Sequence, residues 1–415
     1  MPFVADKDSN SWANCKVEIA KCVVFLLKRT ENRYICPRMK KLYIFNPEND
    51  MALASGSPYY MAPASIKKMA SDLAMLPVWY ADEGSAVLLA DDRQVEWLRK
   101  ECALPLPMEG WVEIPEEKVE VMPWGWNPAL LHRLGDDIRA RVDVDAIRRL
   151  SSRRTAVDLL PKLRMDGTEG ESCWLTSVDE VCAFAMKHDK VLLKAPWSGS
   201  GKGIQPLCGK PDDNLKGWTR RIIASQGGVV GEPFYQKVKD FAMEFKTSLS
   251  GVKFVGYSLF EADARGIYKE NVLASDESIV RKLSEYVPGA LLNVIKERLQ
   301  TELQWLLKND YQGYLGVDMM VIRTADGYAV HPCVEVNLRT NMGVVSRLFF
   351  ERHVWGEVMG RYVIEYFPRP GEAYRFHEEM KEKRPLRLRE GKIEAGYLSL
   401  TPVFEDTNYQ IFVVI

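Results

Sequence analysis

The spacing of hydrophobic and polar residues after residue 39 predicts short strands that alternate with helices. The predicted elements of this first part are strands at 42–46, 77–80 and 86–89, and helices at 64–75 and 92–101. Strands that alternate with helices are typical of an α/β layer with a parallel sheet. We expect loops at 47–63 and at 103–127, of which the second is rich in Pro, Trp and Gly.

From Val144 onward the pattern predicts longer elements. They are two helical pieces around Ser151–Ser152, a strand and a capped helix around Thr176–Ser177, strands at KVLLKAP and near Val229, two strands joined at Ser250–Gly251, one long helix at 278–309, and a hairpin that turns at Asp326–Gly327. Two short apolar runs within 371–415 are expected to complete a sheet. The sequence shows no period of 20 to 50 residues, which argues against a repeat architecture.

The composition is typical of a globular protein with two or three domains. Of 415 residues, 47% are hydrophobic and 27% are charged, and the formal net charge is -1. This balance gives no electrostatic argument for nucleic acid or a membrane surface as a partner, and no apolar run of 18 residues predicts a membrane span. The eight cysteines form no CxxC pair, which argues against a zinc or redox site and favours a reducing, cytoplasmic location.

Residues 1–38 differ from the rest of the chain. Their one apolar run, at 19–27, follows acidic residues and precedes Lys28–Arg29, with no small-residue cleavage site, so a secretory signal is not indicated. A clear element pattern begins at Met39. We therefore expect that 1–38 is an unstructured extension or a mis-assigned start, with translation beginning at Met39.

The first candidate site is a lysine strand followed by a glycine-rich loop. Lys194 lies inside an apolar strand, where its charge is costly unless it meets an anion. The loop residues that follow are Ser198, Gly199, Ser200, Gly201, Lys202 and Gly203. Alternating glycines let backbone N–H groups approach a phosphate closely, although a surface turn with a solvated lysine is the alternative. The P-loop and the Rossmann glycine patterns do not fit this spacing.

The second candidate site is the hairpin that turns at Asp326–Gly327. If Arg323 pairs with Tyr328, Asp318 lies opposite Cys333. This register makes Asp318 a diagonal neighbour of Glu335, about 7–8 Å apart at the backbone. A slip of one residue would separate the pair.

Two carboxylates on one face repel each other unless a cation lies between them. Asp318, Glu335 and Asn337 form an all-oxygen set, which favours Mg²⁺ or Mn²⁺ over zinc. The alternative is a solvent-facing strand with two ordinary carboxylates.

Four segments, in order, resemble those of the ATP-grasp enzymes, over about residues 150–350. They are SSRRTAVDLL, KVLLKAPWSGSGKGI, VVGEPFYQKVKD, and the hairpin that carries an E-x-N-x-R signature from Glu335 to Arg339. The resemblance implies an α/β (α+β) fold: a two-lobed ATP-grasp domain preceded by a smaller parallel-sheet α/β domain. The domains that it implies are 39–145 (N-terminal), 146–228 (small lobe), 229–370 (large lobe with the metal site) and 371–415 (C-terminal strands).

The resemblance also implies roles for individual residues. The residues that would contact ATP are Arg154 (or Arg153), Lys194, Ser198, Gly199, Ser200, Gly201, Gly203, Glu232, Phe234, Tyr235 and Asp240. Those that would hold one or two Mg²⁺ ions are Asp318, Glu335 and Asn337. Arg339 and Lys202 would neutralise charge during catalysis. The sequence departs from the family pattern at Pro233, which removes a hinge N–H donor, and Glu244 is an alternative to Asp240 for the ribose.

Substrate contacts are less well defined. One candidate set is Arg265, Tyr268 and Asn271, which combine a cation with hydrogen-bonding groups. Another is the loop from Asn46 to Tyr60, which carries Asn46, Glu48, Asn49 and Asp50 after the first strand, where open α/β sheets bind ligands. A well-capped surface loop is the alternative there.

The function implied is a Mg·ATP-dependent ligase. It would activate a small-molecule carboxylate as an acyl phosphate and join it to an amine or a peptide, releasing ADP. The alternatives are a phosphotransferase of the same fold and a non-catalytic ATP-binding module. Ligases of this type are often homodimers, so we include a homodimer among the expectations.

Overall fold

The computed structural model describes residues 39–415 with the exception of 101, 105, 107, 116–118, 199–202, 263–267 and 309. The expectation for residues 1–38 lies outside these described residues. From Lys41 to the C-terminus the chain forms one compact unit. In the described part no helix combines the length and the apolar character needed to cross a bilayer.

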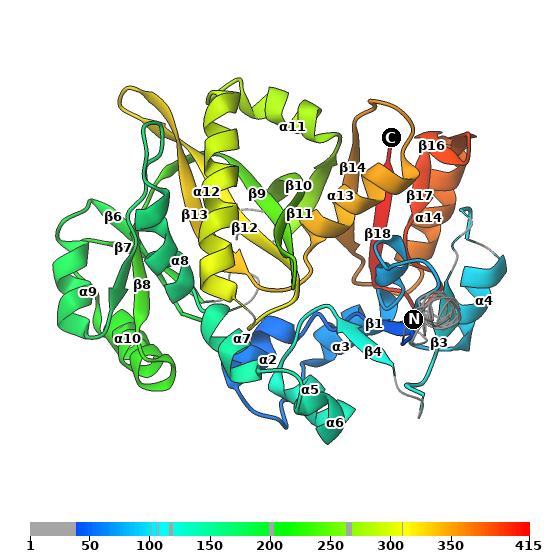
Figure 1. The fold of residues 1–415 in the computed structure, drawn as a ribbon, viewed down its shortest axis with the longest axis horizontal. Helices are drawn as coiled ribbons and strands as arrows, with labels where there is room; N and C mark the ends of the chain where they lie inside the picture. The colour runs from blue at the N-terminus through cyan, green and yellow to red at the C-terminus, as the bar shows by residue number, and fades with distance from the viewer. Residues whose placement is uncertain are drawn as a thin grey trace, which may run out of the picture. The chain divides into compact units, whose positions relative to one another are not determined.

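The N-terminal part contains a four-stranded parallel sheet of order β3-β2-β1-β4 (Figure 1). Its strands are β1 (Lys41–Ile44), β2 (Ala86–Leu88), β3 (Glu109–Trp111) and β4 (Glu120–Pro123). Its helices are α2 (Asn49–Ser55), α3 (Ala64–Asp72), η1 (Leu76–Trp79), α4 (Asp92–Lys100), α5 (Pro128–Leu134) and α6 (Asp136–Arg139).

Three expectations for this part were wrong. The helix α2 lies within a predicted loop, and β3 and β4 lie within the Pro- and Trp-rich stretch at 103–127. These strands are three or four residues long and pair with partners far away in the sequence, so local composition does not reveal them. The predicted strand at 77–80 is largely the 3₁₀ helix η1, because all four η1 residues are buried and no alternation separates a helix from a strand there.

The small lobe is a four-stranded antiparallel sheet of order β5-β8-β6-β7. Its elements are α7 (Val144–Leu150), α8 (Arg154–Leu159), η2 (Leu160–Leu163), β5 (Cys173–Leu175), α9 (Val178–Ala185), β6 (Lys190–Lys194), β7 (Ile204–Cys208), α10 (Asp213–Gln226) and β8 (Val229–Pro233). Val181 and Phe184 of α9 pack with the sheet residues Val191 and Leu193. Because β8 pairs with β5 and β6, this lobe extends past residue 228.

The large lobe is built on an eight-stranded sheet of order β13-β12-β9-β10-β11-β14-β18-β17. Its strands are β9 (Gln236–Ser248), β10 (Gly251–Ala262), β11 (Tyr268–Leu273), β12 (Gly313–Thr324), β13 (Gly327–Asn337), β14 (Gly360–Tyr366), β17 (Tyr397–Ser399) and β18 (Tyr409–Val414). A separate hairpin consists of β15 (Arg387–Arg389) and β16 (Lys392–Ala395). The last strands of the chain therefore extend the large sheet.

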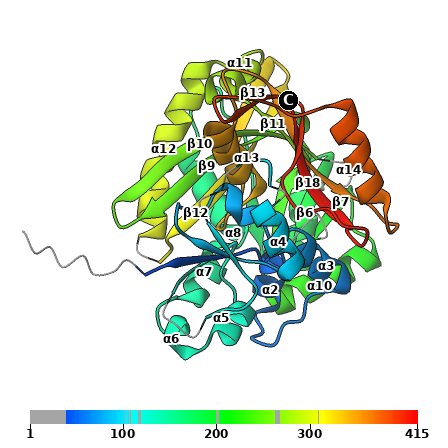
Figure 2. The ribbon, with the colours of Figure 1, turned by 90° about the vertical axis from the view of Figure 1, so that its right-hand side faces the viewer.

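The helices of this lobe are α11 (Asp276–Leu283), α12 (Gly289–Leu307), α13 (Met342–His353) and α14 (Glu372–Lys383). One long helix was expected at 278–309, but Pro288 separates α11 from α12 because it lacks the N–H that a continuous helix needs. Helix α14 lies beside β18 (Figure 2). Phe376 of α14 packs on Phe412 of β18.

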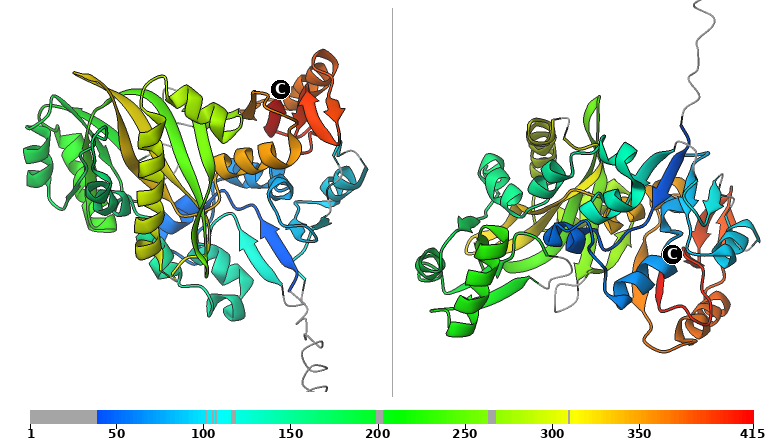
Figure 3. Two further views of the ribbon diagram at one scale, coloured as in Figure 1. Left: turned by 45° about the horizontal axis from the view of Figure 1, so that its top comes forward. Right: turned by 90° about the horizontal axis from the view of Figure 1, so that it is seen from below.

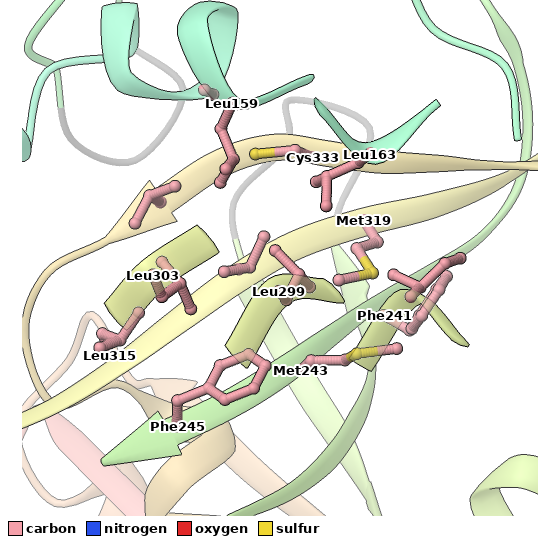
Figure 4. Packing of buried hydrophobic residues seen from close by; sticks show 14 of the residues in the cluster. Leu159, Leu163, Phe241, Met243, Phe245, Leu299, Leu303, Leu315, Met319 and Cys333 are labelled. Atoms are coloured by element: carbon pink, nitrogen blue, oxygen red, sulfur yellow. The ribbon is translucent and has the colours of Figure 1, made fainter. Parts of the chain in front are cut away.

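One face of β9 and β12 is apolar and is covered by α12 (Figure 3). Leu299 and Leu303 of α12 pack with Met243, Phe245 and other buried side chains of these strands (Figure 4). Because side chains alternate along a strand, the intervening residues lie on the opposite face. This second face carries the polar residues of the candidate site, and the arrangement confirms the predicted fold class, with two lobes after a smaller parallel-sheet domain.

Candidate active site

The hairpin β12–β13 places two carboxylates directly opposite each other. Arg323 pairs with Tyr328 as predicted from the turn. Asp318, however, pairs with Glu335 and not with Cys333. The predicted diagonal relation was therefore wrong in register, and the observed relation is closer.

A β-bulge causes this difference. Between the pairs Asp318–Glu335 and Met320–His331, one residue of β12 is matched by three residues of β13. Pro332 is one of the three, and a proline cannot donate a ladder hydrogen bond. The bulge shifts the register by two residues, so the side chains keep their face and the two carboxylates come together.

The electrostatics around Asp318 favour a cation. Burial raises the pKa of Asp318 to about 7, and the neighbouring Glu335 carboxylate raises it further, whereas a hydrogen bond from Asn337 opposes the shift. That bond runs from Asn337 Nδ2 to Asp318 Oδ2 at 3.0 Å. The three predicted metal residues are thus brought together.

Arg153 is the basic residue that faces this carboxylate pair. Its Nη1 donates to the Ala195 carbonyl at 2.7 Å and to Ser198 Oγ at 2.6 Å, and its Nη2 donates to Glu335 Oε2 at 3.1 Å. Only 5% of the Arg153 side chain is exposed, which fixes the guanidinium in place. Arg153 therefore connects the base of the glycine-rich loop to the hairpin.

The sequence prediction named Arg154 first as the basic residue that would contact ATP, but Arg153 is the one that faces the carboxylate pair. The Arg154 side chain is 58% exposed, lies 3.9 Å from Asp158, and stacks over the Trp174 ring at 5.2 Å. Arg154 begins α8, and the residue before it in the chain turns inward. The sequence alone does not distinguish the two adjacent arginines. Their positions at the start of α8 distinguish them, because Arg153 is the N-cap and Arg154 is the first helical residue.

Lys194 and Glu232 form a buried ion pair between two neighbouring strands of the small lobe. Lys194 is 5% exposed and Glu232 is 3% exposed. Ser172 Oγ donates to the other carboxylate oxygen at 3.4 Å. The lysine predicted to meet a phosphate thus has an internal anion, which solves the problem of a charge inside an apolar strand.

The two ends of the glycine-rich loop are anchored. Ala195 N donates to the Gly203 carbonyl at 2.8 Å, and a Cβ on Gly203 would lie 2.4 Å from Ser198 Cβ, so a side chain does not fit there. Trp197 is held by hydrogen bonds from its backbone N to Gln226 and from its Nε1 to the Arg148 carbonyl. The predicted residues Gly199, Ser200, Gly201 and Lys202 lie outside the described residues.

The hinge segment after β8 combines one exposed and one partly buried aromatic residue. Phe234 is 47% exposed, its N–H donates to the Lys190 carbonyl, and Lys190 Nζ lies 3.6 Å from its ring centroid. Tyr235 Oη accepts a hydrogen bond of 2.7 Å from Glu171 N, and burial raises the pKa of Tyr235 to about 12. Asp240, the predicted ribose ligand, is paired with Lys237.

Arg339 is bound by Asp50, a residue of the N-terminal domain. Arg339 Nε donates to Asp50 Oδ1 and Nη2 donates to Asp50 Oδ2, both at 2.8 Å. Burial disfavours charge on both groups, but each partner outweighs this effect: the pKa of Asp50 is lowered and the pKa of Arg339 is raised. Nη2 of Arg339 also donates to Asn337 Oδ1 at 3.2 Å.

Two other polar residues of the segment after β1, Asn46 and Asn49, contact Gly125 within the N-terminal domain. Asn46 is buried and its Nδ2 donates to the Gly125 carbonyl at 2.8 Å, so it joins two segments of the N-terminal domain. Asn49 is also buried against Gly125. Asp50 differs from them, because its side chain binds Arg339, which follows the hairpin β12–β13.

A small cleft brings these parts together. Its lining includes Asp50, Ser198, Glu335, Asn337 and Arg339. The N-terminal domain, the base of the glycine-rich loop and the acidic hairpin each contribute a wall.

A second polar group lies on the same sheet face, at Glu244. This side chain is 1% exposed, and Asn341 Nδ2 donates to its Oε2 at 2.7 Å. Burial raises the pKa of Glu244 to about 8, and the charge of Asp318 adds to this effect. The sequence suggested Glu244 only as a ribose ligand, and an acid in the middle of an apolar strand is the signal that marks it as unusual.

The predicted substrate residues lie near this group. Asn271 is 1% exposed and its Nδ2 donates to Ser258 Oγ at 3.0 Å, while its Oδ1 has no hydrogen-bond partner among the described residues. Tyr268 Oη is also buried, and no described residue forms a hydrogen bond with it. Arg265 lies outside the described residues.

The lysine strand, the hinge and the acidic hairpin occur in this order on a two-lobed fold, which is the arrangement that the resemblance to the ATP-grasp enzymes predicts. No protein-family model matches the sequence, and no curated protein matches it. The solved structures that align with it include N5-carboxyaminoimidazole synthetase from Staphylococcus aureus complexed with ADP (10% identity, 91% of this chain and 93% of that chain, TM-score 0.47).

Two further structures align over the same share of this chain. Biotin carboxylase from Campylobacter jejuni, in a β-γ-ATP complex, is 12% identical, with 91% of this chain and 87% of that chain covered and a TM-score of 0.49. N5-carboxyaminoimidazole synthase from Aspergillus clavatus, with ADP and 5-aminoimidazole ribonucleotide, is 11% identical, with 91% and 94% covered and a TM-score of 0.42.

Proposed function

We propose that the protein is a Mg·ATP-dependent ligase that activates a carboxylate as an acyl phosphate for attack by an amine or a similar nucleophile. The observation that carries this proposal is the direct pairing of Asp318 with Glu335, flanked by Arg153 and Arg339. Two carboxylates held together between two arginines form a site for a metal ion and the phosphate groups that accompany it.

The donor set fits Mg²⁺ or Mn²⁺. Among the described residues no group of three or more His, Cys, Asp or Glu could hold a metal ion by itself. Mg²⁺ is commonly bound by one or two carboxylates together with substrate phosphates, so the pair with the Asn337 amide is sufficient. When bound, the ion would neutralise charge on the β- and γ-phosphates of ATP.

The residues of the chain would divide the remaining work. Lys194 and Arg153 would bind phosphate oxygens as the loop from Ser198 to Gly203 closes over them. The backbone around Phe234 and Tyr235 would line the adenine, and Asp240 would bind the ribose. Arg339 would hold the substrate carboxylate, because a planar guanidinium suits a carboxylate or an acyl phosphate.

The reaction has two balanced steps. A carboxylate oxygen attacks the γ-phosphorus, the bond from that phosphorus to the bridging oxygen of ADP breaks, and ADP leaves. The amine nitrogen then attacks the acyl carbon, loses a proton, and expels inorganic phosphate. A closed loop excludes water, which would otherwise hydrolyse the intermediate.

Hydroxylamine provides a test that does not require the natural amine. It converts an acyl phosphate to a hydroxamate and phosphate, so the ligase proposal predicts hydroxamate formation that depends on ATP, Mg²⁺ and an added acid. A panel of carboxylic acids is incubated with the protein and the iron–hydroxamate colour is recorded. A stable phosphorylated product without hydroxamate would instead indicate a phosphotransferase.

A further inference from the structure

The Asp50–Arg339 ion pair joins the N-terminal domain to the part of the site where a carboxylate is to be activated. Arg339 donates two hydrogen bonds of 2.8 Å to Asp50, one from Nε and one from Nη2. The side chains are 33% and 19% exposed, so the pair lies at the boundary between protein and cleft. Arg339 also contacts Asn337, which is bonded to Asp318. A carboxylate that takes Arg339 therefore lies beside the metal residues.

Such a carboxylate must compete with Asp50 for the guanidinium. If an anion displaces Asp50, the aspartate loses two charge-assisted hydrogen bonds and is left half-buried without a partner. If a cation binds Asp50 instead, Arg339 loses the same two hydrogen bonds and its charge is left without an anion. A ligand that carries both charges leaves neither group unpaired, because its carboxylate replaces Asp50 and its ammonium replaces Arg339.

We propose that the activated acid is a small amino acid, whose carboxylate binds Arg339 and whose ammonium group binds Asp50. This inference rests on the proposed function and names the class of its acid substrate. Asp50 and Arg339 line one cleft together with the proposed metal residues Glu335 and Asn337. Leu53, Pro196 and Trp197 also line it and offer an apolar surface to a short side chain.

The charges of the surroundings agree with this assignment. Of the two carboxylates that line the cleft, Glu335 belongs to the proposed metal set, which leaves Asp50 for an ammonium group. The lowered pKa of Asp50 keeps it ionised through the neutral range. Glu48 lies two residues earlier, at the N-cap of α2, and interacts with Arg133 instead, so it provides a matched control.

The test is a calorimetric titration of the protein in the presence of saturating MgADP, which permits binding without turnover. The probes are the twenty common amino acids with D-alanine and β-alanine, and the matched single charges propionate and ethylamine. We expect at least one amino acid to bind tenfold or more tightly than its counterpart without the amino group and its counterpart without the carboxylate.

Variants separate recognition from a structural role. Asp50→Asn should weaken amino-acid binding at least tenfold and strengthen propionate binding, because it removes both the ammonium acceptor and the internal competitor for Arg339. A purely structural role would move both affinities in the same direction. Asp50→Glu should retain part of the preference, and Glu48→Gln should retain all of it, with folding followed by circular dichroism.

Two negative results have different meanings. If MgADP binds but no amino acid shows the preference, or if Asp50→Asn leaves the preference intact, the inference is overturned and the proposed function stands. If MgADP itself does not bind to the wild-type protein, both are overturned.

Discussion

Replacing Arg153 with methionine should destabilise the protein and weaken Mg·ATP binding, whereas the same change at Arg154 should do neither. Arg153 donates to the Ala195 carbonyl, to Ser198 Oγ and to Glu335. A buried polar group left without its partner costs about 1–3 kcal/mol. The Glu335 side chain is 27% exposed and can be rehydrated, so the loss comes mainly from the other two acceptors and amounts to about 3 kcal/mol in unfolding free energy.

Arg154→Met should lower the free energy of unfolding much less than Arg153→Met. Its contact with Asp158 is long and exposed, and pairs of this kind contribute about 0–1 kcal/mol. Urea unfolding of Arg153→Met, Arg154→Met and the wild type measures both values, and calorimetry with Mg·ATP measures binding. We expect affinity to fall at least tenfold for Arg153→Met only. The reasoning is refuted if Arg154→Met weakens ATP binding as much as Arg153→Met does, or if Arg153→Met binds ATP like the wild type.

Three further predictions concern buried groups. Lys194→Met should cost about 3–5 kcal/mol because it leaves Glu232 buried and unpaired, and urea unfolding should show that Lys194→Met with Glu232→Gln recovers part of the loss. The pKa of Glu244 rises from its ordinary value of 4.5 to about 8 in the fold. Between these values the native state holds a proton that the unfolded chain releases, so the free energy of unfolding should fall as pH rises through that window. Glu244→Gln should flatten this dependence between pH 6 and 9. A Cβ on Gly343 would lie 2.1 Å from Glu244 Oε1, so Gly343→Ala should lower the free energy of unfolding by about 1–3 kcal/mol. Gly217 lies on an open helix face, where the nearest atom to an added Cβ is 3.7 Å away, so Gly217→Ala should not lower it. Parallel urea titrations of the two variants measure both values.

The acidic hairpin shows what the sequence could and could not predict. Its turn and the Arg323–Tyr328 pair followed from the Asp-Gly signal, because a tight turn fixes the first pairs of a hairpin. The pairing of Asp318 with Glu335 depends on a bulge at Pro332, whose size is set by packing around it. The sequence thus indicated that Asp318 and Glu335 lie close together, but it did not predict their direct pairing.

Contacts between distant segments were beyond the sequence pattern. Asp50 and Arg339 are separated by 289 positions, and nothing local to either residue indicates the other. The strands β3 and β4 were missed for a related reason, since each is short and is defined by partners elsewhere in the parallel sheet. Long periodic segments, such as the strands β9 and β10, were found because their own residues carry the signal.

The most direct test of the account is calorimetric titration of Mg·ATP into the wild-type protein and into Glu335→Gln. Glu335 pairs with Asp318 and accepts from Arg153. The variant removes the charge that the proposed metal site needs and retains the shape of the side chain. The account predicts micromolar binding that requires Mg²⁺ in the wild type and is at least tenfold weaker in the variant. Equal affinity of the two proteins, or binding that does not depend on Mg²⁺, would contradict it.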